Sequence, residues 1–110
     1  MGKLKYALFQ HAPLSGATTN LGILFVEESL NYHKFWFPEA IGISSELPVN
    51  VIQKLLMGIK DDVESHTETF DISEYTRFFI NDFKFQHYSV SYQDLQKTID
   101  EICNEYFAKK

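Results

Sequence analysis

Apolar and polar side chains alternate in several short segments of the chain, which is the pattern of β-strands. The alternation is clear over residues 4–11, where both sets of alternate positions contain apolar side chains. A strand with two apolar faces belongs in the interior of a sheet. Further strands are predicted at 21–28, 31–37 and 82–90. Because short connections join the first three strands, we expect them to pair as an antiparallel meander.

Two longer segments repeat apolar residues every three or four positions, as amphipathic helices do. The first covers residues 49–65, and its apolar stripe consists of Val49, Ile52, Leu56, Ile59 and Val63. The second lies near the C-terminus, and its stripe consists of Leu95, Ile99, Ile102, Cys103 and Tyr106. Ser91 and Asp94 predict a capping box before the second helix. Residues 73–80 fit either a short helix or a strand.

We therefore predict an α+β fold with the element order β-β-β-α-(α)-β-α, in which an antiparallel sheet of about four strands has its helices packed on one face. The length of 110 residues fits a single domain over residues 1–110, because a chain of this size has room for one core. Hydrophobic residues make up 45% of the chain and aromatic residues 15%. That apolar content is too high for a disordered chain.

Charge and cysteine content narrow the classes of function. The formal net charge is −5, which repels phosphate backbones, so we do not expect nucleic-acid binding. Such a role would require four lysines to cluster: Lys3, Lys5, Lys34 and Lys84. The single cysteine, Cys103, excludes an intrachain disulfide and a cysteine-based zinc cluster, and it fits a reducing compartment. No apolar stretch approaches the roughly 20 residues that cross a bilayer, so we predict a cytoplasmic protein without a membrane partner.

The stretch SGATTNLGILF, residues 15–25, joins small and polar residues to an apolar strand. A phosphate-binding loop needs closely spaced glycines and usually a lysine before a helix. Here Gly16 and Gly22 are the only glycines, no lysine lies between them, and a strand follows. The stretch is therefore predicted to connect the first two strands. Asn20 would close this connection by bonding nearby backbone groups, and Gly22 would allow a β-bulge or the close packing of an aromatic ring.

The same region carries a family resemblance. Its residues are Tyr6, Ala12, Pro13, Gly16, Asn20 and Gly22, followed by the run Ile23-Leu24-Phe25. Over residues 4–26 this order and spacing resemble the bacterial family called domain of unknown function 3037, although Ala17 stands where those proteins commonly carry an acid. The family has no established activity. Its genes often lie beside kinases resembling the HipA toxins, so the resemblance implies a partner role, with a HipA-like kinase as the partner.

Candidate chemistry is sparse in this sequence. The histidines have neither HxH nor HxxxH spacing, so a metal site would need ligands that meet only in the folded chain. We predict no metal, no cofactor and no catalytic residue. Cys103 is interpreted as a buried, unreactive thiol, and the pair Glu27-Glu28 as solvated charge. Because strand ends converge in a sheet, a ligand or loop site could form from His11, Asn20, Gly22 and His33.

Aromatic residues are the most suggestive feature. The segment 31–37 places aromatic side chains on both faces of one strand, and two or three helices cannot bury all of them. We therefore expect Tyr32 and Trp36 to belong to an exposed interaction surface. The alternative is that helices or a second subunit cover that face.

These observations favour a non-enzymatic protein-interaction module. It would self-associate or bind another protein through a face or an edge strand of the sheet. The alternative is a small-ligand-binding protein or an enzyme with a site near His11, Asn20 and His33, at one end of the sheet. That alternative requires those three side chains to lie together.

Overall fold

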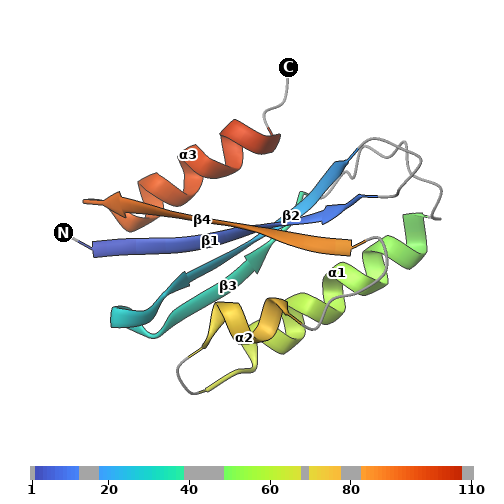
Figure 1. The fold of residues 1–110 in the computed structure, drawn as a ribbon, viewed down its shortest axis with the longest axis horizontal. Helices are drawn as coiled ribbons and strands as arrows, with labels where there is room; N and C mark the ends of the chain where they lie inside the picture. Colours follow the sequence, from blue (N-terminus) through green and yellow to red (C-terminus); the bar gives the residue numbers. More distant parts are fainter. Residues whose placement is uncertain (1, 13–17, 39–48, 68–69, 78–82, 108–110) are drawn as a thin grey trace.

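A computed structural model describes residues 2–12, 18–38, 49–67, 70–77 and 83–107 of the chain (Figure 1). Its strands are β1 (Gly2–His11), β2 (Thr19–Glu27), β3 (Tyr32–Trp36) and β4 (Phe83–Tyr92). Its helices are α1 (Val49–Glu64), α2 (Ile72–Thr76) and α3 (Leu95–Phe107), and a short 3-10 helix, η1 (Glu28–Leu30), follows β2. The predicted α+β class, with an antiparallel sheet, is confirmed.

The strand order in the sheet is β3-β2-β1-β4, and every neighbouring pair is antiparallel. The first three strands form the predicted meander. β4 follows α1 and α2 in the chain and pairs with the other side of β1. β1 is thus a central strand, as its two apolar faces predict. In the described part of the chain, β3 and β4 are the edge strands.

Helices cover both faces of the sheet, so the prediction that they pack on one face is wrong. Leu4 and Leu8 of β1 lie in one core cluster with Ile99 of α3, whereas Ala7 and Phe9 lie in a second cluster with α1. Successive side chains of a strand point to opposite faces. α3 therefore lies on one face, and α1 and α2 lie on the other (Figure 1). Both faces need cover because β1 and β2 are apolar on both sides.

The apolar stripes of the two long helices are confirmed where the structure describes them. The buried members of the α1 stripe are Ile52, Leu56, Ile59 and Val63. The α3 stripe packs against the other face, with Leu95, Cys103 and Tyr106 partly buried around Ile99 and Ile102. The 3.6-residue period thus predicted where both helices lie in the sequence, but it did not predict which face of the sheet each helix covers.

The start of α3 differs from the predicted capping box. Because β4 continues to Tyr92, Ser91 lies in the strand. The Asp94 carboxylate accepts a hydrogen bond from the Lys97 backbone N–H at 3.1 Å. Asp94 is therefore the N-cap of α3.

The segment that fitted either helix or strand begins as a helix. The structure places α2 at Ile72–Thr76, and residues 78–80 lie outside the described residues. Asp71 caps α2 by accepting a hydrogen bond from the Glu74 backbone N–H at 3.1 Å. A helix this short is not stable alone. Burial of Ile72 and Thr76 holds it against the rest of the protein.

Candidate functional site

The predicted ligand residues His11 and His33 lie far apart. His11 pairs with Thr19 of β2 at one end of the sheet. His33 pairs with Val26, which in turn pairs with Lys5. His33 therefore lies at the level of Lys5, six positions of β1 away from His11. At the rise of a β-strand, this separation is about 20 Å. The structure does not bring the two histidines together at one end of the sheet.

Asn20 takes part in a row of amides that crosses the sheet. Gln10 Nε2 donates to Asn20 Oδ1 at 2.7 Å and lies 3.4 Å from Gln86 Oε1. The row therefore links β2, β1 and β4 on the face that α3 covers. Gln10 is buried, and its Oε1 has no hydrogen-bond partner among the described residues. The Asn20 side chain thus accepts a hydrogen bond from Gln10 of the neighbouring strand. The sequence had predicted a bond to nearby backbone groups instead.

Gly22 has both of the structural roles predicted for it. The β1–β2 register shifts between Phe9 and Gln10, so Leu21 of β2 forms an irregularity in the ladder next to Gly22. A Cβ atom on Gly22 would lie 2.6 Å from Cζ of Phe35 and 2.9 Å from the Trp36 carbonyl oxygen. The absence of a side chain lets β3 and its aromatic ring approach the backbone of β2.

His33 contacts the segment that follows α1. Its Nε2 lies 2.6 Å from the His66 carbonyl oxygen, and its ring stacks on Phe70 with centroids 5.4 Å apart. Within the described ranges, no three His, Cys, Asp or Glu side chains gather in a way that could hold a metal ion. The contacts of His33 are those of a residue that ties β3 to this segment.

The aromatic residues of β3 are divided between the two faces of the sheet. Phe35 and Phe37 pack with the α1 core, whereas Tyr32 and Trp36 pack on the side of α3. The Trp36 ring meets Phe107 edge-on at 5.2 Å. Of the two interpretations of the aromatic face, cover by a helix is therefore the one found.

The cover is incomplete, because a groove of about 450 Å³ remains between β3 and α3. From the sheet it is lined by Phe25, Tyr32, Lys34 and Trp36, and from α3 by Gln96, Ile99, Asp100, Cys103 and Asn104. Three aromatic side chains and Ile99 form the apolar part of its lining, and Lys34 and Asp100 add charge. The predicted interaction residues Tyr32 and Trp36 thus line one groove.

Cys103 lies in the wall of this groove and is half-buried. Burial, with a smaller contribution from the Asp100 charge, raises the pKa of its thiol to about 11. A thiol with that pKa is protonated at neutral pH and is a poor nucleophile. The interpretation of Cys103 as an unreactive thiol agrees with this environment.

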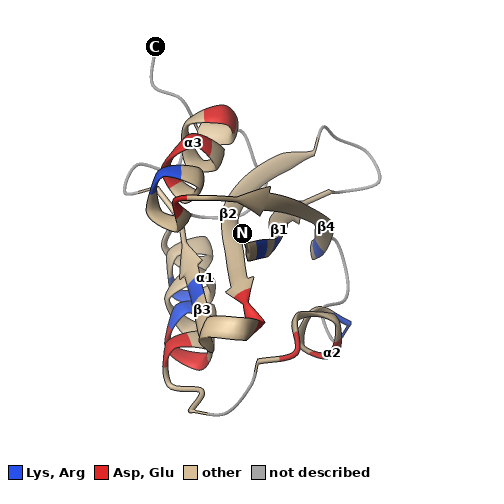
Figure 2. Cartoon of the chain, turned by 90° about the vertical axis from the view of Figure 1, so that its left-hand side faces the viewer, with Lys and Arg blue, Asp and Glu red and all other residues tan. Residues whose placement is uncertain are grey.

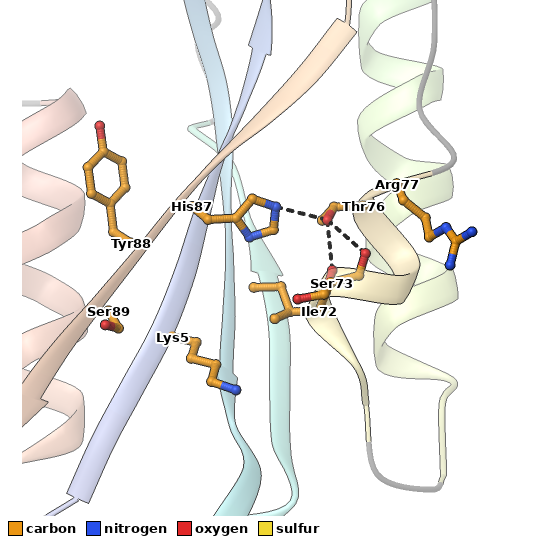
Figure 3. Close-up of a pocket in the computed structure, with 8 residues that line it drawn as sticks. All are labelled: Lys5, Ile72, Ser73, Thr76, Arg77, His87, Tyr88 and Ser89. Atoms are coloured by element: carbon orange, nitrogen blue, oxygen red, sulfur yellow. Dashed lines mark hydrogen bonds between the residues drawn. The ribbon is translucent and has the colours of Figure 1, made fainter.

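An open cavity of about 560 Å³ lies on the opposite face, between α2 and the strands β1 and β4 (Figure 3). Its polar lining residues are Lys5, Ser73, Thr76, Arg77, His87 and Ser89. His87 Nε2 lies 3.0 Å from Thr76 Oγ1, and the Thr76 hydroxyl lies 2.8 Å from the Ile72 carbonyl oxygen. The bond between His87 and Thr76 joins α2 to β4.

Sequence reasoning did not identify this cavity. Its residues come from β1, α2 and β4, which lie far apart in the chain, and the start of α2 was ambiguous. The alternation in β4 does place His87 and Ser89 on one face. Their meeting with Lys5 depends on the strand order, which the sequence did not give.

Glu27 is buried, so its interpretation as solvated charge is wrong. Its carboxylate accepts hydrogen bonds from the Tyr92 hydroxyl, from Ser29 N at 2.9 Å and from Ser29 Oγ at 2.8 Å. These bonds, that of Tyr92 foremost, lower the pKa of Glu27 below its ordinary value. The Tyr92 ring passes over Gly2, where a side chain would collide with it. Glu27 therefore joins β2 to β4 across β1 and caps η1.

The lysines required for nucleic-acid binding do not form one cluster. By the strand register, Lys3 and Lys5 lie on the α1 face of the sheet, and Lys34 and Lys84 lie on the α3 face. In addition, none of the described helices is long and apolar enough to span a membrane.

Within the described residues, these features define an α+β fold in which helices cover both faces of an antiparallel sheet, with a cavity on each face. Comparison with protein-family models, curated proteins and solved structures finds no match for this chain. The resemblance over residues 4–26 therefore stays a prediction.

Proposed function

We propose that this chain is a non-enzymatic protein-interaction module that binds an extended segment of a partner protein in the groove between β3 and α3. One observation carries the proposal. The aromatic residues Tyr32 and Trp36 of an edge strand line a groove whose other wall is a helix. Such a groove suits a peptide that adds a strand to the sheet and inserts side chains beneath the helix.

The main chain of β3 supports this mode of binding. β3 pairs with β2 on one side, and no described strand pairs with its other side. An added strand would satisfy the hydrogen-bonding groups on that side. Every second side chain of the added strand would then point toward α3 and into the groove.

The lining of the groove indicates the chemistry of the bound segment. Phe25, Trp36 and Ile99 favour an apolar side chain in the groove. Asp100 lies on the wall of the groove, and Figure 2 shows further acidic positions along α3. We therefore expect a basic residue next to the apolar one. The first whole protein to test is a HipA-like kinase, which the resemblance over residues 4–26 implies.

The experiment is a selection of displayed peptides on the immobilised full chain, followed by titration of the enriched peptides. Trp36 is the only tryptophan and lines the groove, so its fluorescence reports occupancy directly. We expect enriched peptides to combine apolar and basic residues and to shift the Trp36 emission to saturation.

Two further measurements make this test specific. A bound peptide should slow alkylation of Cys103, which lies in the same groove. Replacement of the exposed Met57 on the opposite face, Met57→Ala, should leave binding unchanged. Enriched peptides that bind without changing the Trp36 emission or the Cys103 alkylation rate would show that another surface is used and would refute the proposal.

A further inference from the structure

The cavity beneath α2 is separate from the groove and has a different chemistry. It opens on the α1 face of the sheet, to which Lys5 and His87 point, whereas the groove lies on the α3 face. Hydroxyl, ammonium and imidazole groups dominate its polar lining. No carboxylate is among its described lining residues, although the chain has 15 acidic residues and a net charge of −5.

The side chains that face the cavity come from three elements. In Figure 3, the side chains of Lys5 from β1, His87 from β4 and Ser73 from α2 surround the same space. The Tyr88 ring and the Arg77 guanidinium point away from it, and Arg77 pairs with Glu74 at 3.0 Å. Ile72 adds an apolar wall. A ligand in the cavity would therefore meet polar groups from several directions and one apolar surface.

The hydrogen bonds of His87 fix which nitrogen faces the ligand. The Thr76 hydroxyl donates its proton to the Ile72 carbonyl at 2.8 Å, so its oxygen accepts from His87 Nε2 at 3.0 Å. The Nε2 atom of His87 thus carries a hydrogen. Its Nδ1 atom is left to face the cavity (Figure 3). There it can accept a hydrogen bond from a protonated ligand oxygen, or donate one when the ring is charged.

Lys5 supplies the positive charge. Its ammonium pairs with Glu28, and both side chains are about half exposed. An exposed ion pair of this kind contributes little to stability, so a ligand can compete with Glu28 for the ammonium at small cost. Glu28 itself does not line the cavity.

From this arrangement we infer that the cavity beneath α2 binds a small phosphate-bearing ligand. The phosphate group would lie among Lys5, Ser73 and His87, and the rest of the ligand would contact Ile72. A tetrahedral phosphate presents oxygens in several directions, which matches hydrogen-bonding groups that converge from β1, α2 and β4. A planar carboxylate would reach fewer of them.

The test is an NMR titration of the isotope-labelled full chain with inorganic phosphate, against sodium chloride of equal ionic strength. We expect phosphate alone to produce saturable shifts that centre on residues 5, 73, 76 and 87. Lys5→Gln should weaken binding about tenfold, the cost of one charge-assisted hydrogen bond. Glu28→Gln should strengthen binding, because it releases Lys5 from its competing partner.

Lys84→Gln is the matched control, because it removes the same charge from β4 on the other face of the sheet. It should leave the affinity within about twofold of the original. Shifts equal to those in sodium chloride would overturn the inference. Equal weakening by Lys84→Gln and Lys5→Gln would also overturn it, since phosphate would then be responding to net charge alone.

Discussion

Glu27 is the residue whose environment differs most from what its neighbours in the sequence indicate. Two adjacent acids followed by a serine are typical of a solvated turn, and Glu28 fits that pattern with its half-exposed side chain. The Glu27 side chain is instead buried, and its carboxylate accepts a hydrogen bond from the Tyr92 hydroxyl of β4. The partner lies 65 positions away, so no local pattern could predict the pair. A hydrogen bond between residues so far apart in the chain can be predicted only when the pairing register of the strands is known.

The Glu27–Tyr92 bond makes stability depend on acidity. Because the folded state lowers the pKa of Glu27, this stabilisation is fully present above the unfolded pKa. It is lost as the pH falls toward the folded pKa. Tyr92→Phe should therefore lower the urea midpoint at neutral pH, and the gap to the original chain should narrow on acidification. Urea titrations between about pH 7 and pH 3 measure this.

Tyr88→Phe is the control for that series, because Tyr88 lies on the same strand and face and stacks on Tyr6 at 5.3 Å. Its effect on the urea midpoint should not change with pH through the range in which Glu27 titrates. If the difference in urea midpoint between Tyr92→Phe and the original chain stayed constant with pH, the Tyr92 hydroxyl would not be what lowers the pKa of Glu27.

At the scale of elements, Gly22 in a strand and Gly58 in a helix differ in whether the protein has room for a side chain. Gly22→Ala should lower the free energy of unfolding by about 1–3 kcal/mol, since the new methyl group overlaps Phe35 and the Trp36 carbonyl. A Cβ atom on Gly58 of α1 would meet no described atom outside its own helix within 4 Å. Gly58→Ala should raise the same free energy by about 0.5–1 kcal/mol, because alanine favours a helix. Chemical denaturation of both variants measures the difference, and equal effects would refute the packing role of Gly22.

The elements also show how far periodicity can predict a fold. Alternation located β1 to β4, and the helical stripes located α1 and α3, because these patterns follow from burial of one or both faces. The same patterns did not say which helix covers which face. β1 is apolar on both faces, so it is compatible with either arrangement. The segment containing α2 was ambiguous because it is short and is held by tertiary contacts of Ile72 and Thr76.

At the scale of the whole molecule, each candidate site lies between the sheet and a helix that packs on one of its two faces. The sequence predicted that Tyr32 and Trp36 belong to one interaction surface, and both line the groove beside α3. It grouped His11 with His33, which the register separates, and it missed the cavity at His87. The two errors have different causes. His11 ends β1 and His33 lies near the start of β3, and these two strands run in the same direction in the meander, so the two histidines lie at opposite ends of the sheet. His87 meets Lys5 because β4 pairs with β1, and a single sequence does not specify that pairing.

The most direct test of the proposed function is a paired charge reversal on α3. Asp100 lines the groove, whereas the adjacent Glu101 is exposed and is not among the residues that line it. Asp100→Lys and Glu101→Lys change the net charge equally, so any difference between them reports position and not total charge. The measurement is the affinity of each variant for a selected basic and apolar peptide, followed through Trp36 fluorescence. Asp100→Lys should weaken binding at least about tenfold and Glu101→Lys less than about threefold; equal effects of the two variants would contradict binding in the groove.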